Sequence, residues 1–466
     1  MPFHPDPDDP GLLSPAETAL LIDQYELAMA ASYHRRGMND VAVFELFVRH
    51  LPPQRKWLLA AGAGPALSLV EAMRFGPREL EYLEGIGFER PFLDDLGGLR
   101  FSGDIDAMPE GTIVFENEPL VRVTAPRIEG QLLETLLLNQ LNFQTAIATK
   151  AARLVIAIGG GHPDRDGRLV DFSPRRDHGV DAAMKAARAA AIAGAGGTSN
   201  VAAAMRYGLQ PVGTMAHSYV MSFEDEEEAF VSFMQDTPHN AVMLVDTYDT
   251  LDGVRHAIEA ARSVDIPLRG VRIDSGDLLS LAKAARRMLD EAGMSGTMII
   301  ASGDLDENRI AELVAAGAPI DRWGVGTDLG TSRDAPAVGG VYKLVADRVE
   351  GQAWRGRMKS SPDKVTLPGL KQVFRRYEDG EMRGDVIASA AEEDVDGKPL
   401  LVPAMRAGRR VGGESLEAMR ARALDELEAL PAALRDLRGE LRPADLYPVK
   451  LSEALKALSG HAGLDK

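Results

Sequence analysis

The spacing of apolar and polar positions changes near Pro126, and it predicts different structures on the two sides of that residue. On the N-terminal side, helical spacing predicts two helices, and alternating positions predict short strands. The helices are expected over residues 14–36 and 57–75, and the strands over 41–50, 112–115 and 120–123. The last two strands flank a turn and predict a small antiparallel sheet. We therefore expect residues 1–125 to form an α+β domain, with a flexible, proline-rich leader over residues 1–12.

A repeating unit of a short apolar run, a turn and an alanine-rich helix follows a long helix predicted over 127–158. The eight runs are 168–172, 196–198, 211–214, 241–247, 270–274, 297–303, 322–327 and 339–345. Strands that alternate with helices pair in parallel, and eight of them make a (β/α) barrel. The predicted fold class is α/β, with a barrel-like core over 126–347. A mixed C-terminal region over 348–466 is expected to pack on the N-terminal domain.

Composition narrows the range of functions. The 466 residues include 52 Lys and Arg against 70 Asp and Glu, which gives a formal net charge of −18. Such a surface repels nucleic acid phosphates and anionic membranes, so neither is an expected partner. Cysteine is absent, which excludes disulfides and thiolate nucleophiles. Because the sequence shows no run of about 20 apolar residues and no signal-like N-terminus, we expect a cytoplasmic protein.

Polar and small residues end the predicted barrel strands, and the active sites of such barrels lie at these ends. The polar members are Arg175, Arg176, His217, Asp246, Arg272, Asp274, Asp304 and Thr327. Gly303, Gly324 and Gly326 permit a close approach of the backbone to phosphate, and the arginines offer planar donors to it. The aspartates suit sugar hydroxyls or Mg²⁺. Any one of these residues fits a structural role, but the set predicts an enzyme that acts on a phosphorylated sugar.

Several common active-site motifs are absent. The sequence contains no GxxxxGK[ST] phosphate loop, no GxGxxG fingerprint, no HExxH metal site and no GxSxG elbow. A barrel enzyme that forms a Schiff base stays open as an alternative, with Lys343 in the eighth run as its nucleophile.

The segments LIDQYELAMAASY, GTMAHS, VRIDSGDL and GGVYKLVAD, in this order, resemble the nicotinate phosphoribosyltransferase family. The resemblance covers about three quarters of the chain and implies a type II phosphoribosyltransferase core. It implies the condensation of nicotinate with 5-phosphoribosyl 1-pyrophosphate to nicotinate mononucleotide and pyrophosphate, coupled to ATP hydrolysis. It also implies a transient phosphohistidine at His217. An imidazole nitrogen is a competent nucleophile near neutral pH, and Asp246 or another acidic residue is expected to orient it.

The resemblance also implies how the base is bound. Phe172 and Tyr25 look like the two faces of a stacking sandwich around the pyridine ring, with Tyr25 contributed by the partner subunit of a homodimer. Ser199 stands where related nicotinamide enzymes carry an Asp. Since a hydroxyl donates to a carboxylate and an Asp repels it, we expect nicotinate to be preferred over nicotinamide. Arg272 is expected to bind the same carboxylate.

The remaining roles concern the phosphoribosyl group. Asp274 resembles the ribose-contacting Asp of the family. Arg175, Gly303, Gly326 and Thr327 are expected to hold the 5-phosphate and the pyrophosphate, and Mg²⁺ is expected to shield the pyrophosphate charge.

Four positions depart from the family pattern: Ser173 and Pro174 before the double arginine, Gly303 in place of Asn, and Asp328 in place of His. They concern the phosphate and ATP contacts, and loss of the ATP coupling is the mildest consequence that we expect. The alternatives are a nicotinamide or quinolinate phosphoribosyltransferase and a non-catalytic relative that binds nucleotide.

Overall fold

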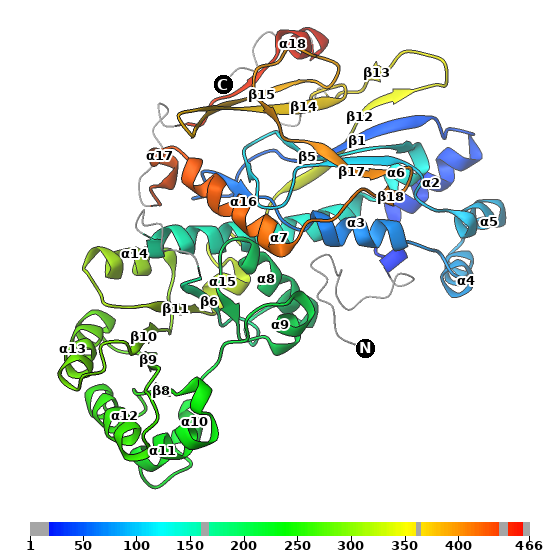
Figure 1. The fold of residues 1–466 in the computed structure, drawn as a ribbon. Coiled ribbons are helices and arrows are strands. Elements are labelled where there is room, and N and C mark those ends of the chain that lie inside the picture. The colour runs from blue at the N-terminus through cyan, green and yellow to red at the C-terminus, as the bar shows by residue number, and fades with distance from the viewer. Residues whose placement is uncertain (1–17, 160–166, 360–364, 438–445, 460–466) are drawn as a thin grey trace. The chain divides into compact units, whose positions relative to one another are not determined.

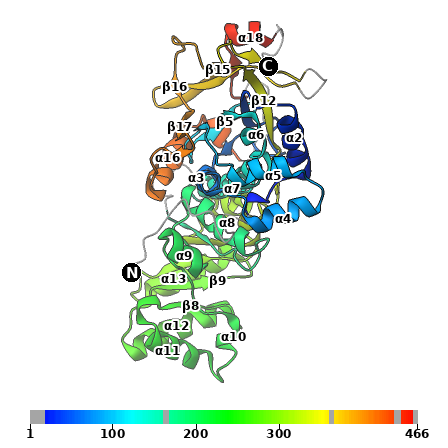
Figure 2. The same cartoon turned by 90° about the vertical axis from the view of Figure 1, so that its right-hand side faces the viewer.

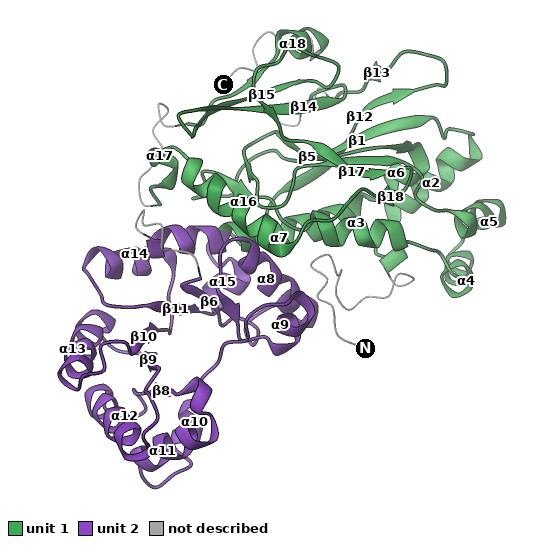
Figure 3. Ribbon diagram, viewed as in Figure 1, with its two compact units in different colours: residues 1–149, 335–466 green, residues 150–334 purple. Residues whose placement is uncertain are grey.

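The computed structural model describes residues 18–159, 167–359, 365–437 and 446–459. The chain forms two compact units, residues 1–149 with 335–466 and residues 150–334 (Figure 3). The second unit is shorter than the barrel segment expected from the sequence, because both ends of that segment pack in unit 1. The predicted leader over 1–12 lies outside the described residues.

Unit 1 contains a sheet of seven strands in the order β13-β12-β1-β5-β3-β17-β18, and all of its pairs are antiparallel (Figure 1). In that order the strands are Arg355–Gly356, Gly340–Arg348, Val41–Val48, Pro119–Pro126, Asp104–Ala107, Val402–Arg406 and Arg409–Arg410. The helices of this part are α2 (Gln24–Arg35), α3 (Ala63–Ala72), α4 (Pro77–Gly85), α5 (Arg90–Gly98), α6 (Arg127–Gln131) and the first half of α7 (Glu134–Gly159).

Two local predictions in this unit were wrong. Residues 57–75 were expected as one helix, but β2 (Leu58–Leu59) precedes α3 there and pairs with β4 (Ile113–Val114). The strands over 112–115 and 120–123 do not pair with each other, because β4 pairs with β2 while β5 inserts between β1 and β3. The pattern identified the strands but not their partners.

The C-terminal region lies in the same unit and adds a four-stranded sheet in the order β16-β14-β15-β19. Its elements are β16 (Lys398–Pro399), β14 (Lys371–Glu378), β15 (Glu381–Ser389), β19 (Val449–Leu451), α16 (Leu416–Ala429), α17 (Ala432–Arg435) and α18 (Glu453–Ser459). The fully buried Arg375 joins these parts by ion pairs to Asp385 on β15 and Glu426 on α16, both at 2.7 Å. Burial and the neighbouring Asp385 raise the pKa of Glu118, which also faces Arg375, well above its usual value.

Unit 2 is built on six parallel strands in the order β7-β6-β11-β10-β9-β8. Their bounds are β6 (Leu169–Asp171), β7 (Gly197–Thr198), β8 (Val242–Leu244), β9 (Gly270–Ile273), β10 (Met298–Ala301) and β11 (Arg322–Val325). The first strand, β6, pairs with the last, β11, as it does where a barrel closes. The sheet is open between β7 and β8, so the unit is an incomplete α/β barrel.

Helices follow the strands of unit 2 as predicted. They are α8 (Val180–Ile192), α9 (Val201–Tyr207), α10 (His217–Val220), α11 (Glu226–Asp236), α12 (Thr250–Val264), α13 (Leu278–Glu291), α14 (Glu307–Ala315) and α15 (Thr327–Thr331), with a short 3-10 turn, η2, over Pro238–Asn240. Helices α11, α12 and α13 pack in sequence order along the sheet (Figures 1 and 2). No helix in the described part of the chain combines the length and apolar character needed to cross a bilayer.

The barrel-like α/β core is confirmed, but eight strands were too many. The run 339–345 belongs to β12, which pairs antiparallel with β1 in unit 1. The run 211–214 forms only one parallel bridge, between Pro211 and Thr198. Proline lacks an N–H donor and glycine weakens a strand, so Pro211 and Gly213 prevent a regular strand where the barrel stays open.

Candidate active site

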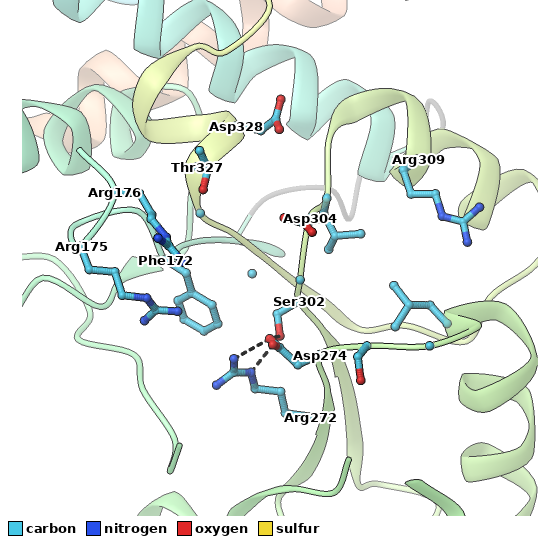
Figure 4. Close-up of a pocket in the computed structure, with 17 residues that line it drawn as sticks. Phe172, Arg175, Arg176, Arg272, Asp274, Ser302, Asp304, Arg309, Thr327 and Asp328 are labelled. Atoms are coloured by element: carbon cyan, nitrogen blue, oxygen red, sulfur yellow. Dashed lines mark hydrogen bonds and ion pairs between the residues drawn. The ribbon is translucent and has the colours of Figure 1, made fainter. Parts of the chain in front are cut away.

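A cavity of about 520 Å³ lies in unit 2 where the carboxyl ends of β6, β9, β10 and β11 meet (Figure 4). Its lining includes eight of the twelve site residues predicted from the sequence: Phe172, Arg175, Arg272, Asp274, Gly303, Asp304, Gly326 and Thr327. Parallel strands bring their carboxyl ends to one edge, which explains why residues up to 155 positions apart in the chain line one space.

Arg272 and Asp274 form the polar centre of the cavity. They lie two residues apart at the end of β9, so their side chains emerge on the same face. The Arg272 guanidinium donates to Asp274 Oδ1 at 2.6 Å and to Ser302 Oγ at 2.8 Å, and Ser302 also donates to Asp274. Burial alone would raise the pKa of Asp274, but the hydrogen bonds from Ser302 and Arg272 and the nearby positive charges lower it. Asp274 is therefore ionised at neutral pH.

Phe172 forms the apolar wall of the cavity. Its N–H donates to the Val325 carbonyl at 2.9 Å, which fixes the start of the loop after β6 against β11. The ring lies over Gly324, where a Cβ would overlap two ring carbons. The Arg272 guanidinium carbon is 5.3 Å from the ring centroid, a cation–π distance. An aromatic face and a guanidinium thus lie side by side.

The turn after β10 depends on glycine. Gly303 has φ +84°, and a Cβ there would collide with the Asp274 carbonyl. Asp304 follows with φ +39°, also in the left-handed region. Gly326 and Thr327 lead from β11 into α15 on the facing side of the cavity. These two turns expose backbone groups toward the same space, as phosphate-binding turns do.

Asp328, the departure from the family pattern, is an internal ion-pair partner. Its Oδ1 lies 3.2 Å from Nζ of the buried Lys150, which also contacts Glu307 Oε2 at 2.5 Å. Arg153 pairs with the other oxygen of Glu307 at 2.8 Å. Lys150 also contacts Asp334 at 3.0 Å, and Arg333 lies 3.7 Å from the other oxygen of Asp328. These two cations offset part of the charge of Asp328, so it repels a bound anion less than a free carboxylate would.

Three predicted residues of unit 2 are absent from the cavity lining but lie at neighbouring strand ends. His217 begins α10, and its Nδ1 is 3.2 Å from Thr247 Oγ1. Asp246 accepts from the Asp274 N–H at 3.0 Å and from Ser275 Oγ at 2.6 Å. The contact of the His217 ring is with Thr247, while Asp246 bonds the segment after β9, so the expectation that Asp246 or another acidic residue orients His217 stays a prediction.

Ser199, the third of these residues, directly follows β7. Its N–H donates to the Asp171 carbonyl at 2.8 Å, so it lies beside the strand that leads into Phe172.

Tyr25, the twelfth predicted site residue, belongs to unit 1. It lies on α2 in unit 1, with 48 % of its surface exposed, and lines a separate cavity of about 410 Å³ with Glu134 and Asn142. Burial and the carboxylates of Glu134 and Glu26 raise the pKa of Tyr25. Its place on the surface of unit 1 leaves its predicted role in a partner's site open.

The Schiff-base alternative loses its geometric basis. Lys343 lies on β12 of unit 1, where its Nζ contacts Glu134 Oε1 at 3.2 Å and the Tyr342 carbonyl at 2.7 Å. The run that carries Lys343 is therefore not a strand of the barrel.

Several residues of the site were missed from the sequence. Ser302 and Thr247 contact predicted residues directly, and Arg309 on α14 adds a guanidinium to the lining. Ser302 and Thr247 are each adjacent to residues that were selected, so their position at a strand end was the available signal. Arg309 lies within the first turn of α14 rather than at a strand end, so its position in the sequence did not mark it as a site residue.

The fold and the cavity define a phosphoribosyltransferase built on an incomplete α/β barrel. The crystal structure of human nicotinic acid phosphoribosyltransferase superimposes with a TM-score of 0.81 at 29 % identity, covering 95 % of this chain and 99 % of that one. A nicotinate-nucleotide pyrophosphorylase from Pyrococcus furiosus has the same fold, with a TM-score of 0.71 at 24 % identity over 90 % of this chain and 97 % of that one.

Sequence comparison identifies the particular family. Models of the nicotinate phosphoribosyltransferase N-terminal domain and of the nicotinate phosphoribosyltransferase family match residues 20–142 and 168–337. Nicotinate phosphoribosyltransferase pncB2 of Mycobacterium tuberculosis is 48 % identical, over 94 % of this chain and 92 % of that protein. Nicotinate phosphoribosyltransferase of Bacillus subtilis is 45 % identical, over 82 % and 78 %. The chain belongs to the nicotinate phosphoribosyltransferase family.

Proposed function

We propose that the protein transfers the phosphoribosyl group of 5-phosphoribosyl 1-pyrophosphate to the ring nitrogen of nicotinate, giving nicotinate mononucleotide and pyrophosphate in NAD biosynthesis. The observation that carries this proposal is the arrangement of Phe172, Arg272 and Asp274 beside the turns at Gly303 and Gly326. One cavity thereby offers an apolar face for a flat ring, a carboxylate for a sugar and backbone turns for phosphates.

Nicotinate is the base that this surface favours. Its ring stacks on Phe172, and its carboxylate is attracted by the Arg272 guanidinium beside that ring. Ser199 at the neighbouring strand end offers a hydroxyl donor rather than a second carboxylate. An amide base would lack the charge that the arginine attracts.

The sugar and its phosphates are held around Asp274. Its ionised carboxylate accepts hydrogen bonds from the ribose hydroxyls. Arg175 and the turns at Gly303, Gly326 and Thr327 bind the 5-phosphate and the pyrophosphate.

Positioning and charge stabilisation supply the catalysis. The bond from ribose C1 to pyrophosphate breaks while the nicotinate nitrogen attacks the opposite face of C1, so the electron pair leaves with pyrophosphate. Charge develops on an oxocarbenium-like ribosyl centre, and the anionic Asp274, bonded to the ribose in this proposal, stabilises that charge. The nicotinate nitrogen already carries its lone pair, so no general base is needed.

ATP is the further co-substrate in this proposal. The γ-phosphoryl group passes from ATP to an imidazole nitrogen of His217, ADP leaves, and water later hydrolyses the phosphohistidine. The support is the position of His217 at the start of α10, where it follows the run 211–214, and its contact with Thr247, which orients the ring.

Mg²⁺ fits the donors of the cavity as a substrate-borne ion. The part of the chain that the structure describes contains no cluster of three or more potential ligands, so a protein-only metal cage is absent there. Asp304 and the substrate phosphates would hold the ion, since Asp328 is paired with Lys150. Bound there, it neutralises charge on the pyrophosphate.

A homodimer in the cytoplasm completes the proposal. Unit 2 exposes several large apolar side chains, and exposed apolar side chains are suited to burial against a second copy. These are Val180, Val201, Met205, Met221 and Tyr248, each at least 59 % exposed. The partner's α2 would present Tyr25 to the base, which fits the exposure of that ring.

Comparison of three bases tests the proposed function. Purified protein with 5-phosphoribosyl 1-pyrophosphate and Mg²⁺ is supplied with nicotinate, nicotinamide or quinolinate, and the mononucleotide is quantified. We expect nicotinate to react with the highest kcat/KM. A higher value for nicotinamide or quinolinate would overturn the base assignment, and no turnover of any base would favour a non-catalytic relative.

A further inference from the structure

The carboxylate of Asp171 is buried at the end of β6 and is not part of the cavity lining. Its side chain is 1 % exposed, and its two oxygens accept different hydrogen bonds. Oδ1 accepts from the Ser173 N–H at 2.9 Å, and Oδ2 accepts from Thr198 Oγ1 at 2.7 Å. Burial raises the pKa of Asp171, while these bonds oppose that shift.

The two hydrogen bonds connect two strand ends. Ser173 directly follows Phe172, and Thr198 directly precedes Ser199. The main chain adds a third connection, because the Asp171 carbonyl accepts from the Ser199 N–H at 2.8 Å. Thr198 Oγ1 also accepts from the Asn200 N–H at 3.0 Å, which extends the network to the start of α9.

A second carboxylate fixes the far end of the same loop. Asp177 Oδ2 accepts from Ser173 Oγ at 3.1 Å, and its N–H donates to the Ser173 carbonyl at 3.2 Å. The other oxygen of Asp177 fills the space where a Cβ on Gly330 would be, so α15 packs directly on this side chain. The loop that carries Phe172 is therefore held by hydrogen bonds to Asp171 at its start and to Asp177 at its end.

We propose that Asp171 is a positioning residue that fixes the spacing between Phe172 and Ser199, and thereby sets the affinity for nicotinate and its preference over nicotinamide. This inference rests on the proposed function, in which Phe172 stacks on the ring and Ser199 lies beside the carboxylate. Asp171 itself touches no substrate. It acts through the Thr198 hydroxyl on one side and the Ser173 amide on the other.

Thr198→Val tests the connection, because valine keeps the shape of the side chain and removes the hydroxyl that donates to Asp171 and accepts from the Asn200 N–H. Thr297→Val is the matched control: Thr297 is also buried, at 4 % exposed, and its hydroxyl donates to the Leu268 carbonyl at 2.8 Å before the neighbouring strand. That bond lies at the amino ends of β9 and β10, opposite the cavity. Thr297→Val loses one buried interstrand hydrogen bond away from the site, whereas Thr198→Val loses the bond to Asp171 at the site and also the acceptor of the Asn200 N–H.

We expect Thr198→Val to raise KM for nicotinate about tenfold, which is about 1.4 kcal/mol, and to reduce the nicotinate preference. KM for 5-phosphoribosyl 1-pyrophosphate should change less than about twofold, as should every constant of Thr297→Val. Asp171→Ala should show the same pattern more strongly, and Asp171→Asn should recover part of it, since an amide can bond both Ser173 and Thr198.

Equal effects on nicotinate binding in Thr198→Val and Thr297→Val would overturn the inference, as would unchanged KM and base preference in Thr198→Val and Asp171→Ala. Amide hydrogen exchange gives a readout independent of turnover: residues 171–178 should exchange faster in Thr198→Val and not in Thr297→Val, whereas the Asn200 amide loses its own acceptor and is left out of the comparison. A wild-type protein that turns over no nicotinate would refute the proposed function itself, and the exchange data would then still decide whether Asp171 couples the two segments.

Discussion

Gly324→Ala tests the stacking role of Phe172 without altering Phe172. A Cβ at residue 324 would overlap ring carbons Cδ2 and Cε2 of Phe172 and lie 3.3 Å from Cγ. Carbon atoms pack at about 3.5–4.0 Å, so the ring must move by roughly 1 Å to admit the methyl group. Inserting a methyl group into a packed site costs about 1–3 kcal/mol. If the displacement falls on bound nicotinate, KM for nicotinate rises between about fivefold and about 150-fold.

Steady-state kinetics with each substrate varied in turn measures this effect. KM for 5-phosphoribosyl 1-pyrophosphate should stay within about twofold, because the sugar and phosphate groups contact other residues. Gly296→Ala is the control, since a Cβ there meets no atom within 4 Å. Unchanged nicotinate KM in a folded Gly324→Ala protein would refute the assignment of Phe172 as the stacking surface.

Three further predictions concern ATP, ribose and pH. His217→Ala should abolish ADP formation while phosphoribosyl transfer without ATP continues, as product and ADP assays would measure; ADP formation at the wild-type rate would exclude a phosphohistidine there. Asp274→Asn should lower kcat/KM for 5-phosphoribosyl 1-pyrophosphate by about 100-fold, since it removes the anion at the ribose, and wild-type kinetics would contradict that role. Burial, opposed by hydrogen bonds from Thr135, raises the pKa of Glu26 to about 7 from 4.5. Its stabilising contribution as a neutral acid is therefore lost as pH rises from about 4.5 to 7, by up to about 3 kcal/mol. Denaturant unfolding across this pH range should show that loss relative to Glu26→Gln, and parallel pH profiles of the two proteins would contradict it.

The sequence predicted the cavity best where its residues end barrel strands. Arg272 and Asp274 are two positions apart on one strand, so the alternation of side chains already places them on one face. Gly303 and Gly326 were chosen for close backbone approach, and the conformation of Gly303 and its contact with the Asp274 carbonyl explain why residue 303 is a glycine.

Predictions of strand pairing were wrong, and predictions of side-chain contacts stayed open, where they depended on which distant segments of the chain meet. Residues 340–348 have the pattern of a strand whichever sheet receives them, and they pair with β1 instead of completing the barrel. Asp246 and Thr247 are neighbours, and the local rotation of the chain after β8 decides which of them meets His217. The pattern of apolar and polar residues does not predict that rotation.

The central claim is that this cavity joins nicotinate to a phosphoribosyl group. The most direct measurement incubates the purified protein with nicotinate, 5-phosphoribosyl 1-pyrophosphate and Mg²⁺, with and without ATP, and quantifies nicotinate mononucleotide and pyrophosphate. We predict equal amounts of the two products, with ATP increasing the yield. Intact 5-phosphoribosyl 1-pyrophosphate and no mononucleotide, under conditions where the protein is folded, would contradict the account.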